Sequence, residues 1–505
     1  MSDLSIQGRF QAADEANAAA APRLRAHLAA LAARAGRIPI AAVVLFYLIL
    51  PNVASQLSTH VLSALPHGYV NLEVLLIGAV GVFLPRWALF SLLLADSLAD
   101  CAYSICYTYQ FSLGDLLESV HFLGVMPERR LLAGAVALTA SVFVSAVLAL
   151  VRPDPRRRVR AVCALLAPLA ILLPADILNG QNSLWHKDVT LLSWRVARSP
   201  ILVLGVREAF ALSTESRSRQ AEDAPMPSAS ARMDSLLESL PRGAIAPNVV
   251  LIVVESWGLP LDPRLDEALT APYADPAIAR RYRIAYGAAP FTGLTVPGEA
   301  RELCHSTMGF GILHLSNQAA QRCLPDQFHA RGYESIAIHG YAGEMFYRAA
   351  WYRELGFDRA WFGADLKAMG LPRCGGAFPG ICDGAIANFI GGTVLSPPQS
   401  RPRFVYWVTL NSHLPVPVRP DLPADTVCAA QLALRASEAL CSWFRLVRAV
   451  HESVSRVAAG ALARPTVFLL VGDHAPPFGD PRLRSQFSST QVPYVMLAPK
   501  DATGR

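Results

Sequence analysis

The sequence predicts a protein in two parts: an N-terminal bundle of about five transmembrane helices and a C-terminal α/β domain with a mainly parallel sheet. Three observations predict this fold class. Hydrophobic residues make up 53% of the 505 residues, and the mean hydropathy of +0.32 is too high for a purely soluble protein. The long apolar runs all precede residue 180. From residue 248 onward, short β-rich runs alternate with helical stretches.

The apolar runs of the first part are long enough, or nearly so, to span a bilayer, and each is bounded by charge or proline. They lie at 38–58, 69–84, 87–108, 131–151 and 159–178. The run at 69–84 is short, and one helix fewer would invert the side on which the tail lies. We interpret the first run as an anchor and not as a cleaved signal peptide, because its basic arm is long and further spans follow.

The placement of arginines predicts the orientation of the bundle. Arginines occur throughout the arm before the first run, Arg86 separates the second and third runs, and RPDPRRRVR (152–160) separates the fourth and fifth. By the positive-inside rule these segments face the cytoplasm, so the chain after residue 175 lies outside. The predicted segments are a cytoplasmic arm (1–36), a transmembrane helical domain (37–178), a juxtamembrane segment and linker (179–247), and the α/β domain (248–505).

Two acids lie within the third apolar run. Asp96 and Asp100 are four residues apart, on one face of a helix, at a depth where charge is costly. They therefore face other helices or a polar cavity. We favour pairing with another helix, and contact with a lipid headgroup is the alternative.

Six of the nine cysteines lie in the tail, which fits an oxidising compartment. Their short spacings favour pairing in chain order, among the several connectivities that six cysteines allow. Free buried thiols or a zinc site are the alternatives, and the lack of a C-x-x-C pair in the sequence weakens the zinc alternative. The six residues are Cys304, Cys323, Cys374, Cys382, Cys428 and Cys441.

Ligand-type side chains follow the apolar runs of the α/β domain, at the ends where parallel sheets collect their ligands. They are Glu255, His339, Asn411, Ser412, His413, Asp473 and His474. Together with a threonine from the loop at 291–299, they can converge on one divalent metal. Each also has a simpler interpretation: Glu255 as a turn cap, Asp473 and His474 as an exposed loop pair, and His413 as a hydrogen-bonded structural histidine.

Five ordered motifs carry a family resemblance over about 248–500. They are PNVVLIVVES (247–256), TVPGE (295–299), HGYAGEMFYRAAWYRELGFD (339–358), NSHLP (411–415) and VGDHAP (471–476). They resemble the motifs of the sulfatase-like phospholipid headgroup transferases of the alkaline phosphatase superfamily, which include lipoteichoic acid synthases and phosphoethanolamine transferases. The helical anchor ahead of them is similar to the plan of that family.

The resemblance implies a role for each matching residue. The implied metal ligands are Glu255, Thr295, Asp473 and His474. Thr295 is also the implied nucleophile, with His413 as acid or base beside it. The implied substrate contacts are Arg348, Phe346, His339 and His413. The sequence departs from the synthases where Phe346 and Tyr347 replace Phe-Trp, and the Cys304 loop is closer to the phosphoethanolamine branch.

Metal coordination makes this chemistry possible because it lowers the pKa of a bound hydroxyl and neutralises the charge of a phosphodiester. Sulfatases carry an oxidisable cysteine or serine in a C/S-x-P-x-R pattern, whereas a threonine ester must be relieved by an outside acceptor, which favours transfer. Thr292 is the competing nucleophile. We prefer Thr295 because Pro297 and Gly298 fix the turn after it, while Glu299 either caps the following helix or positions the loop.

We therefore expect a multi-pass protein of the bacterial inner membrane with a periplasmic catalytic domain that moves phosphoethanolamine from a phospholipid to an envelope glycan or lipid. Zinc is the favoured metal, with manganese or magnesium as alternatives. The net charge of +6 without an aromatic-interleaved basic stripe argues against nucleic acid. Alternative functions are a glycerol phosphate transferase, a sulfatase or phosphodiesterase, and a catalytically silent scaffold, against which the intact ligand set argues.

Overall fold

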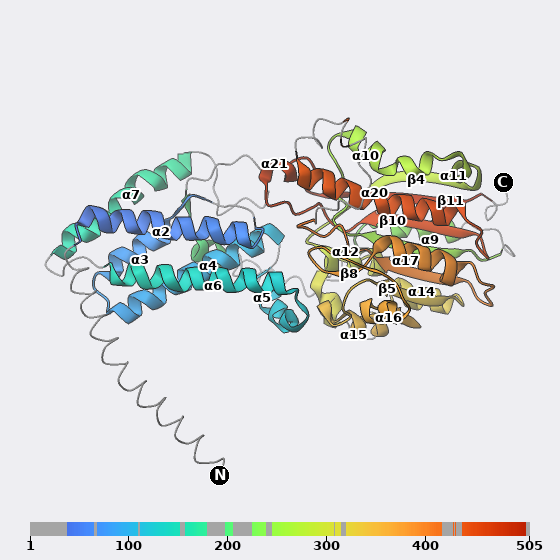
Figure 1. Ribbon diagram of the computed structural model, residues 1–505, viewed down its shortest axis with the longest axis horizontal. Coiled ribbons are helices and arrows are strands. Elements are labelled where there is room, and N and C mark those ends of the chain that lie inside the picture. Colours follow the sequence, from blue (N-terminus) through green and yellow to red (C-terminus); the bar gives the residue numbers. More distant parts are fainter. Residues whose placement is uncertain are drawn as a thin grey trace, which may run out of the picture.

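The computed structural model describes residues 38–64, 68–109, 112–151, 157–178, 197–205, 225–238, 245–307, 309–314, 320–416, 428, 430 and 437–500. The predicted cytoplasmic arm and most of the predicted juxtamembrane segment lie outside these residues. A helical part and an α/β part lie end to end along the long axis of the molecule (Figure 1). The two-part architecture predicted from the sequence is therefore confirmed.

Each of the five apolar runs forms a helix: α2 (Ile40–Val61), α3 (Leu72–Gly81), α4 (Arg86–Tyr109), α6 (Glu128–Leu150) and α7 (Arg158–Leu178). Within the described residues, α2, α4 and α6 are long and apolar enough to cross a membrane. Helix α3 has only 10 residues, so the predicted count of about five spanning helices is too high. Helix α7 contains Pro168 and Pro174.

The helices of the bundle pack through small apolar contacts and leave an apolar outer surface. The hydroxyl of Tyr47 on α2 donates a hydrogen bond to the carbonyl of Leu148 on α6 (3.1 Å). On the outer side of α2, Leu45, Ile49 and Val53 are exposed. An apolar exterior around a packed interior is what contact with lipid requires.

The two acids of α4 are buried and paired. The guanidinium of Arg198, on the short strand β2 (Ala197–Arg198), donates to both carboxylate oxygens of Asp100 (2.9 Å each) and to Asn52 Oδ1 (2.8 Å). Asn71 Nδ2, on β1 (Val70–Asn71), donates to Asp96 Oδ2 (2.8 Å). Both carboxylates thus link elements within the bundle, as the favoured interpretation expected.

The α/β part contains a seven-stranded sheet of order β4-β11-β10-β3-β9-β5-β6. The strands from β10 to β6 run parallel, whereas β11 is antiparallel to both of its neighbours. The strands are β3 (Asn248–Val254), β4 (Tyr282–Pro290), β5 (Glu334–His339), β6 (Arg359–Trp361), β9 (Arg403–Val408), β10 (Thr466–Gly472) and β11 (Gln491–Pro499). A mainly parallel sheet is confirmed.

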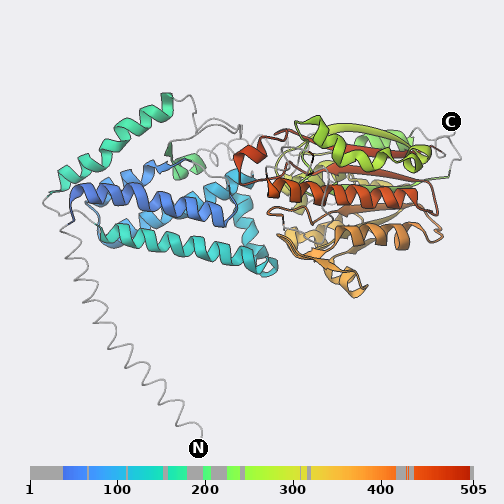
Figure 2. The ribbon, with the colours of Figure 1, turned by 45° about the horizontal axis from the view of Figure 1, so that its top comes forward.

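Helices cover both faces of this sheet, and Figure 2 shows them on either side of it. Every residue of β3 and β10 is buried for this reason. One face packs against α10 (Pro263–Thr270), α17 (Asp383–Phe389) and α20 (Glu438–Ala459). The other packs against α12 (Thr295–Cys304), α14 (Leu324–Ala330) and α15 (Arg348–Glu354).

Shorter elements complete the two parts. They are α5 (Leu113–Glu118), η1 (Ser119–Val125), α9 (Ser230–Glu238), η3 (Ala271–Ala274), α11 (Pro276–Arg281), η4 (Gly309–His314), η5 (Met345–Tyr347), α16 (Gly363–Ala368), β7 (Arg373–Cys374), β8 (Gly380–Ile381), η6 (Ile390–Leu395) and α21 (Pro481–Arg484).

The six cysteines of the tail pair in chain order, as predicted. The disulfides are Cys304–Cys323, Cys374–Cys382 and Cys428–Cys441. The remaining three cysteines lie on the helices of the bundle and are free.

The bundle contacts the α/β part through η1 and α6. The ring of Phe122 packs edgewise on Phe346 (centroids 5.3 Å apart) and on Tyr347 (4.8 Å). Both partners have left-handed backbones, with φ of 54° and 50°, a conformation that non-glycine residues adopt only where their surroundings hold it. Arg130 Nη2 donates to the carbonyl of Leu414 (2.8 Å). The membrane helices thus touch two loops of the α/β domain.

Candidate active site and metal centre

Four of the predicted site residues meet at the carboxyl edge of the sheet. Glu255 follows β3, Asp473 and His474 follow β10, and Thr295 opens α12. All four side chains are buried. The ligand atoms of Glu255, Asp473 and His474 lie within 4.8 Å of one another, and Thr295 Oγ1 donates a hydrogen bond to Glu255 Oε2 (3.0 Å). The exposed-pair interpretation of Asp473 and His474 is therefore wrong.

The cluster fits a divalent cation. His474 Nδ1 donates to the carbonyl of Ala475 (2.9 Å), which directs Nε2 toward Asp473 Oδ2 (3.3 Å) and Glu255 Oε1 (3.5 Å). His474 Nε2 and Asp473 Oδ2 are buried and have no hydrogen-bond partner among the described residues. Buried polar atoms in this state are costly, and a cation between them would satisfy both. Two carboxylates, an imidazole and a hydroxyl are ligands that zinc accepts.

The electrostatics of the site are set by burial and by the charges within it. Burial, reinforced by the charge of Glu255, raises the pKa of Asp473 to about 8. Burial opposes the charged form of His474, but Asp473 and Glu255 outweigh it and raise the pKa of His474 to about 9. For Glu255, burial is outweighed by His413 and His474, so its pKa lies below the usual range. Without a cation, the site therefore holds protons in its place.

Two serines next to the ligands orient them. Ser256 donates its backbone N–H to Asp473 Oδ1 (2.7 Å) and its hydroxyl to Glu255 Oε1 (2.8 Å), and its backbone is left-handed (φ 56°). Ser412 Oγ donates to the carbonyl of Glu255 (2.6 Å). Sequence reasoning assigned no role to Ser256, although its position directly after Glu255 was a signal for one.

The start of α12 positions the threonine. Thr295 is the first residue of the helix, where the unpaired backbone N–H groups and the helix dipole favour a phosphate. Gly298 lets the helix approach β10 closely, because a Cβ at this position would lie 2.9 Å from Asp473 Cβ and 3.0 Å from its Cα. The side chain of the competing Thr292 is exposed, whereas Thr295 contacts a candidate ligand.

Glu299 is the centre of a buried hydrogen-bond network one helical turn after Thr295. Its Oε1 accepts from Arg348 Nε (3.0 Å) and Nη2 (2.6 Å), and its Oε2 accepts from the hydroxyls of Tyr352 (2.8 Å) and Tyr406 (3.1 Å). Glu299 lies within α12 and does not cap it. The guanidinium of Arg348 is thus committed to this ion pair, and its predicted contact with a headgroup stays a prediction. Sequence reasoning missed both tyrosines.

The two predicted substrate histidines are buried and close to the cluster. His339 Nδ1 donates to the carbonyl of Val408 (3.2 Å), and burial together with the charge of Arg348 lowers the pKa of His339 to about 3. His413 Nδ1 donates to the carbonyl of Leu414 (2.8 Å), and burial lowers the pKa of His413. Both imidazoles are therefore neutral at physiological pH. The ring of Phe346 lies under the Arg348 guanidinium (5.3 Å).

Comparison with known proteins places the α/β domain in a family. The sulfatase family model matches residues 247–504. No curated protein matches the chain by sequence. Among solved structures, a protein of the alkaline phosphatase superfamily from Vibrio parahaemolyticus is similar at 16% identity and a TM-score of 0.36, over 54% of this chain and 65% of its own length.

Two further structures are similar over the same domain. One is the lipoteichoic acid synthase LtaP from Listeria monocytogenes, at 13% identity and a TM-score of 0.35, over 51% of this chain and 67% of its own length. The other is the Streptococcus pyogenes phosphoglycerol transferase GacH, at 14% identity and a TM-score of 0.35, over 59% of this chain and 76% of its own length. The family match covers just over half of the chain and coincides with the domain that carries the site, so this chain belongs to the sulfatase family.

Proposed function

We propose that this chain is a membrane-anchored, metal-dependent transferase that moves a phospholipid headgroup, with phosphoethanolamine favoured, to a glycan or lipid acceptor of the cell envelope. Thr295 carries the group between the two half-reactions. The observation that carries the proposal is the placement of this hydroxyl 3.0 Å from Glu255, at a helix N-terminus and beside the buried cluster with Asp473 and His474.

Glu255, Asp473, His474 and the Thr295 hydroxyl would hold the divalent ion, for which zinc is favoured and manganese or magnesium are alternatives. Bound there, the ion would lower the pKa of the hydroxyl and neutralise phosphoryl charge. Thr295 Oγ then attacks phosphorus as its proton leaves. A bond from Oγ to phosphorus forms, the bond to the diacylglycerol oxygen breaks, and that oxygen takes up a proton.

The surroundings of Thr295 support a role for His413 and for the helix. His413 is neutral, so its free ring nitrogen can accept the proton of an incoming hydroxyl, and the resulting imidazolium can protonate a departing oxygen. The unpaired N–H groups at the start of α12 favour the phosphoryl group. In the second half-reaction, the acceptor hydroxyl attacks the phosphothreonine and Thr295 Oγ leaves with a proton.

Two features favour transfer over hydrolysis. A threonine has a secondary hydroxyl that the oxidation used by sulfatases does not convert to an aldehyde, so its ester persists until an acceptor arrives. The position at which the C/S-x-P-x-R pattern has arginine holds Glu299, which is fully engaged with Arg348 and two tyrosines. The three disulfides favour the phosphoethanolamine branch and a periplasmic catalytic domain on an inner membrane. Glycerol phosphate transfer is the alternative.

The test uses the full-length protein in lipid nanodiscs that contain headgroup-labelled phosphatidylethanolamine or phosphatidylglycerol. Peptide mass spectrometry should find a phosphoethanolamine increment on Thr295, absent from the Thr295→Ala variant and retained in the matched Thr292→Ala variant. A glycerol phosphate increment would identify the other donor. Release of the headgroup to water at the same rate with and without a glycan or lipid A-type acceptor would indicate a phosphodiesterase and refute the transferase.

A further inference from the structure

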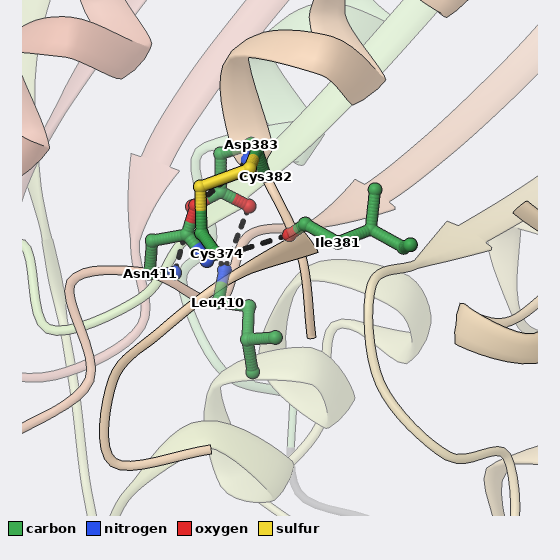
Figure 3. Close-up of a disulfide and its surroundings, with 6 residues drawn as sticks. All are labelled: Cys374, Ile381, Cys382, Asp383, Leu410 and Asn411. Carbon is green, nitrogen blue, oxygen red and sulfur yellow. Dashed lines mark hydrogen bonds between the residues drawn. A yellow bond between two sulfur atoms is a disulfide. The ribbon is translucent and has the colours of Figure 1, made fainter. Parts of the chain in front are cut away.

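A disulfide-closed loop lies against the loop that carries His413. Cys374 on β7 and Cys382 after β8 are bonded, and Asp383 begins α17 directly afterwards. Figure 3 shows the Asp383 carboxylate directed at the backbone of Leu410 and Asn411. It accepts the N–H of Leu410 with both oxygens (3.0 and 3.1 Å) and the N–H of Asn411 with Oδ2 (2.7 Å).

The contact between the two loops is reciprocal. Asn411 Oδ1 accepts the N–H of Asp383 (2.8 Å), and Asn411 Nδ2 donates to the carbonyl of Ile381 (3.4 Å). Asp383 is 4% exposed, and the hydrogen bonds of its carboxylate go to backbone amides. Burying a carboxylate is costly unless such charge-assisted hydrogen bonds offset it. The group therefore has a structural task at this position, two residues before His413.

The disulfide-closed loop also touches His413 itself. Phe378, within the loop, packs the edge of its ring against the imidazole, with centroids 4.6 Å apart and planes at 73°. From the other side, Ser412 is bonded to the carbonyl of Glu255. The His413 loop is thus held between Asp383 with Phe378 on one side and a candidate metal ligand on the other.

The same segment reaches the loop after His339. The N–H of Ile381 donates to the carbonyl of Gly340 (2.9 Å). The approach is so close that a Cβ on Gly380 would lie 2.4 Å from the Gly340 oxygen and 2.4 Å from Leu410 Cδ2. Residues 380–383 therefore lie between the two strand ends that carry the predicted substrate histidines.

We propose that Asp383 is a positioning residue for the transfer reaction: its carboxylate, backed by the disulfide-closed loop at 374–382, fixes the backbone at 410–411 so that the His413 imidazole faces the substrate. The inference rests on the proposed function for the role of His413, but the clamp itself is a property of the fold. It adds a residue that neither the motifs nor the metal cluster includes.

The test compares Asp383→Asn with the matched variant Asp275→Asn in the full chain. Asparagine keeps the size of the side chain but turns an NH₂ group toward amides that need an acceptor. Because small misplacements of an acting group are costly, kcat should fall about 10- to 100-fold, with KM for the lipid donor and zinc content unchanged. Asp275 also accepts a backbone N–H (from Ala277, 2.7 Å) at a helix start, and its variant should keep wild-type kcat.

A second measurement does not depend on activity. Hydrogen exchange of the Leu410 and Asn411 amides should accelerate in Asp383→Asn and stay at the wild-type rate in Asp275→Asn. If Asp383→Asn fails to fold, Phe378→Leu replaces it, because leucine keeps an apolar contact but loses the ring edge against His413. For Phe378→Leu, kcat should fall several-fold with KM unchanged.

The outcomes separate this inference from the proposed function. If the wild-type chain forms no adduct on Thr295, the proposed function fails, and hydrogen exchange at 410–411 still decides whether the clamp exists. If the wild type transfers a headgroup while Asp383→Asn keeps both its kcat and its exchange rates, the positioning role is overturned and the proposed function stands.

Discussion

Binding of zinc to the metal-free site at pH 7 is expected to release about two protons. The pKa of Asp473 is raised to about 8, chiefly by burial, and that of His474 to about 9 by the two carboxylates beside it. At pH 7 the metal-free protein therefore carries a proton on Asp473 in roughly 90% of molecules and on His474 in roughly 99%. Both side chains must give up these protons to bind metal.

Calorimetric titration of the metal-free protein with zinc checks this count. The apparent heat, measured at one pH in buffers of different ionisation enthalpy, gives the number of protons released. Because protons compete with the metal below the two pKa values, affinity should fall about 100-fold for each unit that the pH drops below 7, and level off above pH 9. Replacing Glu255 by Gln removes a charge that raises both values, so fewer protons should be released. Heats that do not depend on the buffer between pH 6 and 7.5 would refute this reasoning.

Further predictions concern the packing around the site. Glu299→Gln leaves a buried guanidinium without its carboxylate and should destabilise the fold by about 3–5 kcal/mol, seen as a lower thermal midpoint in detergent. Tyr352→Phe removes one hydrogen bond to the same carboxylate and should cost only about 1–2 kcal/mol; an equal effect of both variants would contradict the ion-pair account. Gly298→Ala places a methyl group 2.9 Å from Asp473 Cβ and should weaken zinc retention against a chelator, whereas Gly392→Ala, whose Cβ meets nothing within 4 Å, should not.

The parts of the site that the sequence revealed are those next to strand ends. The runs that became β3 and β10 are continuously apolar, so the polar residues directly after them, Glu255 and Asp473 with His474, marked the carboxyl edge of the sheet. The family motifs then picked Thr295 out of a loop that has no periodic pattern.

The helix count was wrong for a local reason. The run at 69–84 contains Asn71, whose side chain accepts the N–H groups of Glu73 and Val74 and caps the helix start at Leu72. The helix then ends at Gly81, shortly before Pro85. An apolar run therefore gave a helix of 10 residues, and the cap signal within it was visible in the sequence.

Contacts between distant elements were beyond the reach of the sequence. The partners of Glu299 come from α15 and β9, and those of Asp383 come from the loop after β9. A single acid after a cysteine carries no signal until the chain is folded. The antiparallel direction of β11 was also hidden, because a strand buried on both faces has the same apolar run whichever way it points.

The contacts of Phe122 and Arg130 with the α/β domain bear on how the protein should be studied. A water-soluble fragment that begins at the linker would keep the sheet, the disulfides and the ligand cluster. It would lose the guanidinium that holds the Leu414 carbonyl and the ring that covers Phe346 and Tyr347, next to the loop of His413. Rate constants from such a fragment would describe a loosened form of the enzyme, and only the intact chain in a bilayer would report its working speed.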